Sequence, residues 1–252
     1  MMLRGILMVA LLACPGLALP QAGLPPPKPP AIVAIVIDDI ESVAQVEAFL
    51  EIPAPLTFAI LPTAQGASAV AARLSVLHRE YMIHLPMEPV EADLITGPGF
   101  LNTMMDDAVI QAVLDRHIGA MPGAKGANNH MGSRFTQDRA RMEAVLRVLA
   151  RHKMYFIDSR TTHDTVGKAA AVAVGIPELD RDVFLDNEPE ESAVLARLDE
   201  LVHIALERGC AVGIGHPRPT TLGALKRFVG TLKPGELTVV PPSALLNSPC
   251  RN

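Results

Sequence analysis

The apolar positions along the chain alternate between short runs and helical spacing. Eight short apolar runs are expected to form strands, at residues 31–37, 56–61, 81–84, 123–128, 154–157, 183–185, 211–214 and 237–240. Six stretches between them carry apolar residues at spacings of three and four, which predicts helices at residues 42–50, 67–78, 106–121, 137–152, 190–208 and 221–232. Strands that alternate with helices predict parallel strands with right-handed crossovers. Seven or eight such units favour a (β/α) barrel-like α/β fold, and an open doubly wound sheet is the alternative.

The first 30 residues do not follow this alternation. An apolar run at residues 5–13 follows Arg4, which predicts an export signal within residues 1–22, too short to span a bilayer. An uncleaved anchoring helix is the alternative, and residues 11–14 also resemble a lipoprotein leader that would be lipidated at Cys14. The proline-rich residues 23–30 predict an extended linker. The folded domain is therefore expected at residues 31–246, with a tail at 247–252.

This leader predicts a protein of the bacterial periplasm or cell envelope, attached to the membrane only through the leader or a lipid anchor. Three cysteines are too few for a disulfide scaffold or a cysteine-based zinc cluster. An oxidising compartment permits a disulfide between Cys210 and Cys250, and two separate thiols are an equal alternative.

Composition narrows the classes of function. With 252 residues, 49% hydrophobic and 19% charged, the chain has enough apolar side chains for a packed core. It has 22 Lys and Arg against 27 Asp and Glu and no basic block, which argues against nucleic acid as a partner. Aromatic residues make up 4%, too few for a surface that stacks long sugar chains. No glycine-rich phosphate loop follows the first strand, so no nucleotide cofactor is expected. The sequence does not indicate an oligomeric state.

Polar side chains gather where the predicted strands end. They form six groups, at Asp38-Asp39 and at residues 83–89, 128–134, 158–160, 186–187 and 213–219. Because the carboxyl ends of parallel strands form one face, these groups are expected at a single mouth. We expect the adjacent Asp38 and Asp39 to point in different directions. One of them would then face the buried end of the strand, where it needs a cation or hydrogen-bond donors.

Structural roles compete with chemical ones at several of these positions. Asp39 could equally be a helix N-cap, and Glu88 could be a loop cap or an oxygen that faces a metal. Asp158 and Arg160 could form an ion pair that orders the rim of the mouth. The histidines on or beside the predicted helices are given no chemical role; they are His78, His117, His152, His163 and His203.

One Asp and two His around an open position would make a mononuclear catalytic metal site. Zinc suits such nitrogen and oxygen ligands best, and other divalent ions are alternatives. The metal would bring the pKa of a water to about 7 and would polarise a carbonyl oxygen. A nearby carboxylate could then accept the water's proton, and an opposing His could protonate the leaving group.

Six motifs together resemble the divergent polysaccharide deacetylases, a bacterial envelope family related to carbohydrate esterases. The motifs are Asp38-Asp39, HLPMEP at 84–89, NNHMGS at 128–133, FIDSRT at 156–161, FLDN at 184–187 and GHPRP at 215–219. The resemblance covers residues 31–246. It implies a (β/α) barrel-like deacetylase fold, a zinc-type site and a carbohydrate substrate from the cell envelope.

The resemblance also implies roles for individual residues. By analogy with ordinary polysaccharide deacetylases, Asp38 would be the base, Asp39 a metal ligand, His84 a second ligand and His216 the proton donor. Those enzymes have another His four residues after the position of His84, where this chain has Glu88, so we assign the remaining ligand to His130. Five residues are assigned to substrate contact or to support of the ligands: Glu88, Asn129, Asp158, Arg160 and Arg218.

A second departure from the family pattern is Glu41, which replaces its usual Gly. Glu41 would alter the turn or act as a favourable anion in the first turn of a helix.

Two functions compete. The first, which we prefer, is a metal-dependent hydrolase that removes acetyl groups from an N-acetylated envelope carbohydrate. The second is a non-catalytic, metal-holding periplasmic binding or envelope-assembly protein with the same fold, which Glu41, Glu88 and the few aromatic residues favour. A glycosidase is a weaker third interpretation, because it needs two carboxylates that span a sugar ring.

Overall fold

The computed structural model describes residues 30–91, 97–233 and 235–246. The predicted export signal, Cys14, nearly all of the linker and the tail at 247–252 lie outside the described residues. The described strands are β1 (Ala31–Ile40), β2 (Thr57–Ile60), β3 (Tyr81–Met87), β4 (Gly126–Met131), β5 (Tyr155–Asp158), β6 (Glu178–Asp180), β7 (Val183–Phe184), β8 (Cys210–Gly215) and β9 (Leu237–Val239). The described α-helices are α1 (Val43–Leu50), α2 (Ala67–Val76), α3 (Asp107–Ala120), α4 (Arg139–Arg151), α5 (Gly167–Val174), α6 (Glu191–Arg208), α7 (Pro219–Thr231) and α8 (Pro242–Leu245).

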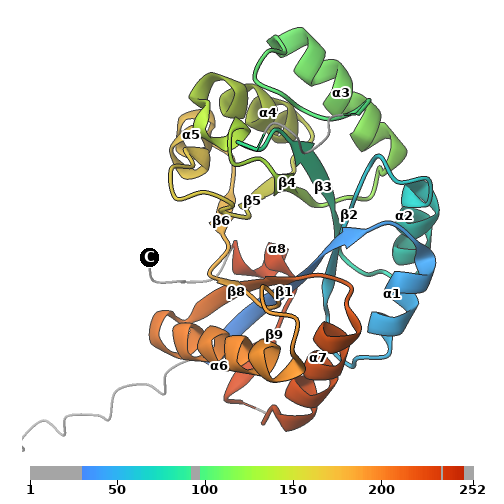
Figure 1. Cartoon of the computed structure of the whole chain (residues 1–252), viewed down its shortest axis with the longest axis vertical. Helices are drawn as coiled ribbons and strands as arrows, with labels where there is room; N and C mark the ends of the chain where they lie inside the picture. Colours follow the sequence, from blue (N-terminus) through green and yellow to red (C-terminus); the bar gives the residue numbers. More distant parts are fainter. Residues whose placement is uncertain (1–29, 92–96, 234, 247–252) are drawn as a thin grey trace, which may run out of the picture.

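The strands form one parallel sheet in the order β6-β5-β4-β3-β2-β1-β8-β7, and β9 pairs with the beginning of β1. The sheet curls, and most of the helices lie around its outside, while α8 lies in the middle of the view (Figure 1). The expected (β/α) barrel-like fold is therefore confirmed. Its carboxyl strand ends meet at one mouth, as parallel strands require.

Strand β1 is the centre of this sheet. Its apolar run is buried on both faces, with Ile35 and Ile37 in the layer beneath the helices and Ala34 and Val36 in the smaller cluster on the other face. Leu245 of α8 belongs to that smaller cluster as well. Short helix α8 thus packs against the inside of the curled sheet, near the amino ends of the strands.

The sequence pattern misses three elements, which are α5, β6 and the four-residue helix α8, and it misplaces two boundaries. Helix α5 is almost entirely apolar, so it lacks the polar face that marks an amphipathic helix, and β6 is only three residues long. Strand β3 continues to Met87 and β4 to Met131, which places Asn128, Asn129 and His130 inside a strand rather than after it.

The expected place of Glu41 in the first turn of a helix is wrong. Helix α1 begins at Val43 behind the N-cap residue Ser42, so Glu41 precedes the helix. The side-chain oxygen Oε1 of Gln45 accepts hydrogen bonds from the backbone N–H groups of Glu41 and Ser42, both at 2.9 Å. Gln45 therefore supplies an acceptor to the two backbone N–H groups that directly precede helix α1.

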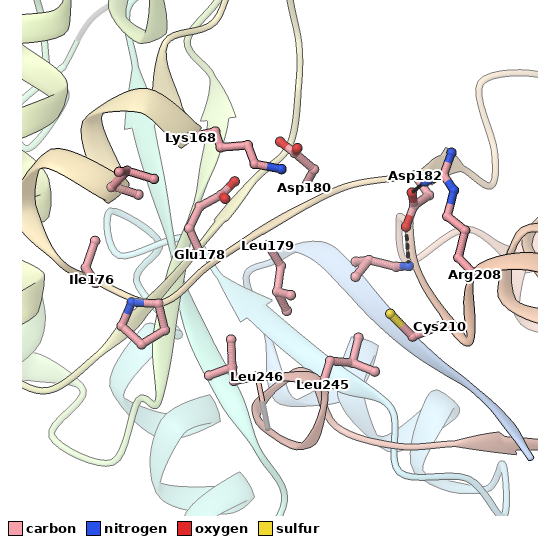
Figure 2. A pocket seen from close by; sticks show the side chains of 14 residues that line it. Lys168, Ile176, Glu178, Leu179, Asp180, Asp182, Arg208, Cys210, Leu245 and Leu246 are labelled. Atoms are coloured by element: carbon pink, nitrogen blue, oxygen red, sulfur yellow. Dashed lines mark hydrogen bonds and ion pairs between the residues drawn. The ribbon is translucent and has the colours of Figure 1, made fainter. Parts of the chain in front are cut away.

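The barrel has a seam between the two ends of the sheet. Strands β6 and β7 are joined by Arg181 and Asp182 alone, and no ladder links these two strands in the described part of the chain. A groove of about 690 Å³ opens along this seam, between α5 and β6 on one side and β8 and α8 on the other. Cys210 lies on the β8 wall of the groove (Figure 2), and it is disulfide-bonded.

None of the helices in the described part of the chain combines the length and apolarity that a membrane crossing requires.

Glu178 is the most perturbed carboxyl group of the seam. Burial, followed by the negative charges of Asp180 and Asp158, raises the pKa of Glu178 to about 8, while Lys168 opposes the shift. Its buried Oε1 has no hydrogen-bond partner. Figure 2 shows Glu178 and Asp180 beside Lys168 at the top of the groove. The ionised form of Glu178 is therefore unfavourable in the folded protein.

Replacing this carboxyl group should stabilise the protein at alkaline pH. Because the folded-state pKa of Glu178 is raised, the folded protein holds a proton that the unfolded chain loses above about pH 4.5, and stability falls as pH rises toward 8. We expect Glu178→Gln to increase the free energy of unfolding at pH 8 by on the order of 2–4 kcal/mol. The gain should vanish near pH 4.5, as measured by denaturant unfolding. The exposed Glu236→Gln is the control, and an equal gain at both pH values would contradict the titration of Glu178.

Candidate active site

The carboxyl end of β1 is bulged, and this sets the geometry of the site. Between Ile37 and Ile40 the strand contains one residue more than its partner β2, where Phe58 and Ile60 are the matching positions. Asp39 takes a left-handed conformation with φ 54°, which Asp tolerates better than most residues. The bulge breaks the alternation of side chains along β1. The expectation that Asp38 and Asp39 point in different directions is therefore wrong.

Both carboxylates reach the same imidazole. His84 Nε2, from β3, lies 3.1 Å from Asp39 Oδ1 and 3.6 Å from Asp38 Oδ2. His130, from β4, places Nδ1 2.9 Å from Asp39 Oδ1 and 3.2 Å from His84 Nε2. The structure thus brings Asp39, His84 and His130 together as a group that could hold a metal ion. Their role as ligands stays a prediction.

The register of β3 and β4 explains this meeting. His84 lies opposite Asn128, and Pro86 lies opposite His130. Because side chains on one face of a strand recur every second residue, Asn128 and His130 both face the side of His84, and Asn129 faces away. Two histidines from neighbouring strands therefore converge on Asp39.

The three groups fit a divalent cation. Asp39 Oδ1 is buried without a hydrogen-bond partner, although two imidazole nitrogens lie within 3.1 Å of it. Such an oxygen is costly unless something positive reaches it. Its distances to the two nitrogens are close to those between ligand atoms that surround one zinc ion at about 2.0–2.1 Å, roughly 3.4 Å. One carboxylate and two imidazoles also match the donor types that zinc prefers.

The charges around His84 also favour a cation. Burial opposes the charged imidazole, but the carboxylates of Asp38 and Asp39 outweigh it and raise the pKa of His84. Burial likewise opposes the ionised form of Asp39, but His130 and His84 hold the pKa of Asp39 well below its ordinary range. Two ionised carboxylates and two neutral imidazoles together carry a net negative charge. A proton or a metal ion bound among these side chains would balance it.

His216 approaches the same cluster from β8, which lies on the other side of β1 from β3 and β4. It follows β8, and its Nε2 lies 3.8 Å from Asp39 Oδ2. Its Nδ1 donates to Asp186 Oδ1 at 2.8 Å, while Asp186 Oδ2 accepts from the His216 backbone N–H and from Thr221 Oγ1, both at 2.7 Å. Asp186 is 1% exposed. These contacts fix the imidazole plane and direct Nε2 toward the cluster.

Asp186 also sets the charge of His216. Burial lowers the pKa of His216, but the hydrogen bond and charge of Asp186 outweigh it, so that the pKa is raised. For Asp38 the balance is different, since burial raises the pKa of Asp38 and the opposing charge of His84 does not restore it. The site thus contains a carboxyl group of raised pKa, that of Asp38, and an imidazole whose charged form is favoured, that of His216.

The five remaining predicted residues contact the backbone and side chains around the strand ends, and Asn129 and Asp158 among them are buried. Glu88 Oε2 accepts from the backbone N–H of Thr103 at 2.7 Å, and Glu88 Oε1 lies 3.4 Å from Arg134 Nε. Asn129 accepts from the backbone N–H of Ser159 at 2.9 Å and donates to the Met131 carbonyl at 2.7 Å. These contacts fit the loop-cap interpretation of Glu88.

Asp158 and Arg160 do not form the ion pair that the sequence suggested. Arg160 Nη1 instead lies 3.4 Å from Asp180 Oδ1, and buried Asp158 accepts from the Arg160 backbone N–H at 2.8 Å and from Thr165 Oγ1 at 2.6 Å. Arg218 donates to the backbone carbonyl of Asp186. Asp158 and Arg218 therefore order the backbone on which the site is built.

Sequence reasoning missed Asn128 and left Asp186 without a role. Asn128 is 0% exposed and contacts both His84 and Asp38, and Asp186 is the partner of His216. Both residues stand at the end of an apolar strand and within the motifs at 128–133 and 184–187, but many capping residues share that position and the motifs give neither residue a role.

The fold and the site together define a curled, barrel-like parallel α/β protein with an Asp-His-His cluster at its mouth. The family model for divergent polysaccharide deacetylases matches residues 35–246. The chain belongs to the divergent polysaccharide deacetylase family.

Relatives and solved structures agree with this assignment. The uncharacterized protein YibQ of Escherichia coli is 33% identical over 218 residues, which are 86% of this chain and 68% of YibQ. The structure of uncharacterized protein ATU2773 from Agrobacterium tumefaciens superimposes with a TM-score of 0.81 at 22% identity, covering 87% of this chain and 90% of that one. A mutant of BA3943, a CE4 family pseudoenzyme of Bacillus anthracis with restored enzymatic activity, gives 0.58 at 16% identity, covering 88% and 70%.

Removing any of the three clustered side chains should weaken metal binding. We expect Asp39→Ala, His84→Ala and His130→Ala each to raise the Kd for Zn²⁺ by at least on the order of 100-fold, because two protein ligands chelate an ion poorly. Competition with a chromogenic chelator measures this. His203→Ala is the control, because His203 is exposed on α6. His117 would be a poorer control, because it is buried and its replacement would remove a hydrogen bond to the Gly99 carbonyl. Unchanged affinity in His130→Ala would remove His130 from the ligand set.

Metal affinity should also fall as the pH is lowered. A proton and a metal compete for the same nitrogen of His84, and the raised pKa of His84 extends this competition above about pH 6.5, the ordinary value for His. We expect the Kd for Zn²⁺ to rise steadily from about pH 8 to pH 6. An affinity that is constant over this range would contradict binding at the imidazoles.

Proposed function

We propose that this protein is a metal-dependent hydrolase that removes acetyl groups from an N-acetylated carbohydrate of the cell envelope. One observation carries the proposal: the buried carboxyl group of Asp38 and the Asp186-bound imidazole of His216 both lie next to the Asp39, His84 and His130 cluster. A base and an acid that flank a metal-binding group are the parts that amide hydrolysis requires. The family membership supports a carbohydrate substrate.

Asp39, His84 and His130 would hold the divalent ion, for which zinc is our choice. When bound, such an ion polarises a carbonyl oxygen and makes water a stronger nucleophile at neutral pH. The protein would meet its substrate in the bacterial periplasm or cell envelope, as the predicted leader at residues 1–22 suggests.

Asp38 would act as the base. It is 2% exposed, and burial raises the pKa of its carboxyl group, which makes its ionised form a stronger proton acceptor. Asn128 Nδ2 donates to Oδ1 at 2.8 Å, and Oδ2 is the oxygen nearer to His84 Nε2. Oδ2 is therefore suited to accept the proton of a water that attacks the acetyl carbonyl carbon.

His216 would act as the acid. Asp186 raises the pKa of His216 and so favours the imidazolium, and Nε2 faces the cluster. As the carbonyl C–N bond breaks, Nε2 gives its proton to the departing nitrogen, so that a neutral amine leaves instead of an amide anion. Water thus adds to the acetyl carbon, acetate forms, and the two proton transfers involve Asp38 and His216.

The second candidate is a non-catalytic protein that keeps the fold and the metal group. The structural similarity to a CE4 family pseudoenzyme supports this alternative, because a barrel of this type exists without activity. The loop-holding role of Glu88, where ordinary deacetylases carry a His, fits it as well.

Substitutions that spare the metal ligands should separate chemistry from metal binding. We expect Asp38→Asn and His216→Ala to retain Zn²⁺ and to lower kcat for acetate release from N-acetylated oligosaccharides by on the order of 10²–10⁴-fold. The parent enzyme should give a bell-shaped profile of kcat/KM against pH. Activity should rise with pH as Asp38 ionises and fall as His216 loses its proton, with both limbs belonging to the coupled site.

The controls distinguish the two functions. His203→Ala should keep full activity. Acetate release that is unchanged in both Asp38→Asn and His216→Ala would place the chemistry elsewhere. A parent protein that holds Zn²⁺ and releases no acetate from any N-acetylated oligosaccharide would favour the non-catalytic alternative.

A further inference from the structure

We propose that Asn128 is a positioning residue whose single side-chain amide orients both His84 for metal binding and Asp38 for proton transfer. The half that concerns Asp38 rests on the proposed function, whereas the half that concerns His84 needs only metal binding. Asn128 is fully buried in β4, directly opposite His84 of β3.

The orientation of the amide follows from Asp38. Asn128 Nδ2 lies 2.8 Å from Asp38 Oδ1, and Asn128 Oδ1 lies 2.8 Å from His84 Nδ1. A carboxylate oxygen can only accept, so the amide NH₂ must face Asp38 and the amide oxygen must face His84. Rotating the amide by 180° would place two oxygens against each other in a buried site, which is costly.

This orientation dictates the tautomer of His84. Because the amide oxygen can only accept, Nδ1 of His84 must carry a hydrogen. The lone pair of a neutral His84 is then on Nε2, the nitrogen that faces Asp39 and His130. A hydrogen bond to the other ring nitrogen is the usual means by which proteins fix the orientation of a metal-binding imidazole.

The Asn128 amide contacts only one of the two carboxylate oxygens of Asp38. Oδ1 is engaged by the Asn128 amide, which leaves Oδ2 directed toward the cluster, 3.6 Å from His84 Nε2. Asn128 therefore couples the position of the base to the position of a ligand through one rigid group on a central strand.

Two substitutions separate these tasks. Asn128→Asp keeps an acceptor for His84 Nδ1 but places a carboxylate oxygen against Asp38 Oδ1. We expect it to bind Zn²⁺ within about 3-fold of the parent and to lose on the order of 10²-fold in kcat with little change in KM. Asn128→Leu removes both hydrogen bonds at similar volume, and we expect its Kd for Zn²⁺ to rise by about 10–100-fold.

The matched control is Thr57→Val, which replaces another fully buried polar side chain of a strand, one whose Oγ1 has no hydrogen-bond partner. It should change neither Zn²⁺ affinity nor kcat. Nitrogen NMR of the metal-free protein, at a pH where His84 is neutral, adds a readout of the His84 tautomer. The metal must be absent because Zn²⁺ on Nε2 would by itself leave the hydrogen on Nδ1. Nδ1 should be protonated in the parent and in Asn128→Asp, and the preference should weaken in Asn128→Leu.

Parent-like Zn²⁺ affinity and tautomer in Asn128→Leu would overturn the His84 half of the proposal. Parent-like kcat in Asn128→Asp would overturn the Asp38 half. If Asn128→Leu does not fold, Asn128→Asp decides the second half, and Asn128→Ala with the same Zn²⁺ titration decides the first. A parent that releases no acetate would defeat the proposed function and the Asp38 half with it, and the Zn²⁺ and tautomer measurements would still decide the role of Asn128 toward His84.

Discussion

Two consecutive carboxylates at the end of a strand that is buried on both faces are the constraint around which the mouth of the barrel is arranged. Asp38 and Asp39 close the apolar run of β1, and the bulge at Asp39 turns both toward His84. Buried negative charge needs partners. The partners come from the neighbouring strands: His84 from β3, with Asn128 and His130 from β4.

Backbone strain is concentrated at the same edge of the sheet. Among the described residues, five other than glycine have positive φ, and three of them, Asp39, Met131 and Arg160, lie at or directly after the carboxyl ends of β1, β4 and β5. Conformations of this kind cost about 1–3 kcal/mol each and persist where the surroundings impose them. Asn129 supplies part of that support, since it donates to the carbonyl of Met131 and accepts from Ser159.

The site has two halves that differ in how they are built. The half formed by β1, β3 and β4 is a compact, mostly buried network in which Asn128 contacts both His84 and Asp38. The half formed by Asp186 and His216 follows β7 and β8, across the seam from β6, and is held by Thr221 and Arg218 at the start of α7. The proposed hydrolysis would use both halves, whereas the proposed metal binding would use only the first. A relative that lost activity and kept the first half would therefore retain the metal group.

The sequence by itself determined the alternation of strands and helices. With it came a parallel sheet and the single edge at which Asp38, His84, His130 and His216 are found, while an open doubly wound sheet stayed an alternative to the barrel. Local patterning suffices there, because an apolar run between amphipathic helices has few other arrangements. The tertiary structure alone decided the bulge at Asp39, the hydrogen bond between His84 and Asn128, and the hydrogen bond by which Glu88 holds the loop at Thr103. Each depends on register between strands that lie far apart along the chain, and a register shift of one residue reverses which side chains share a face.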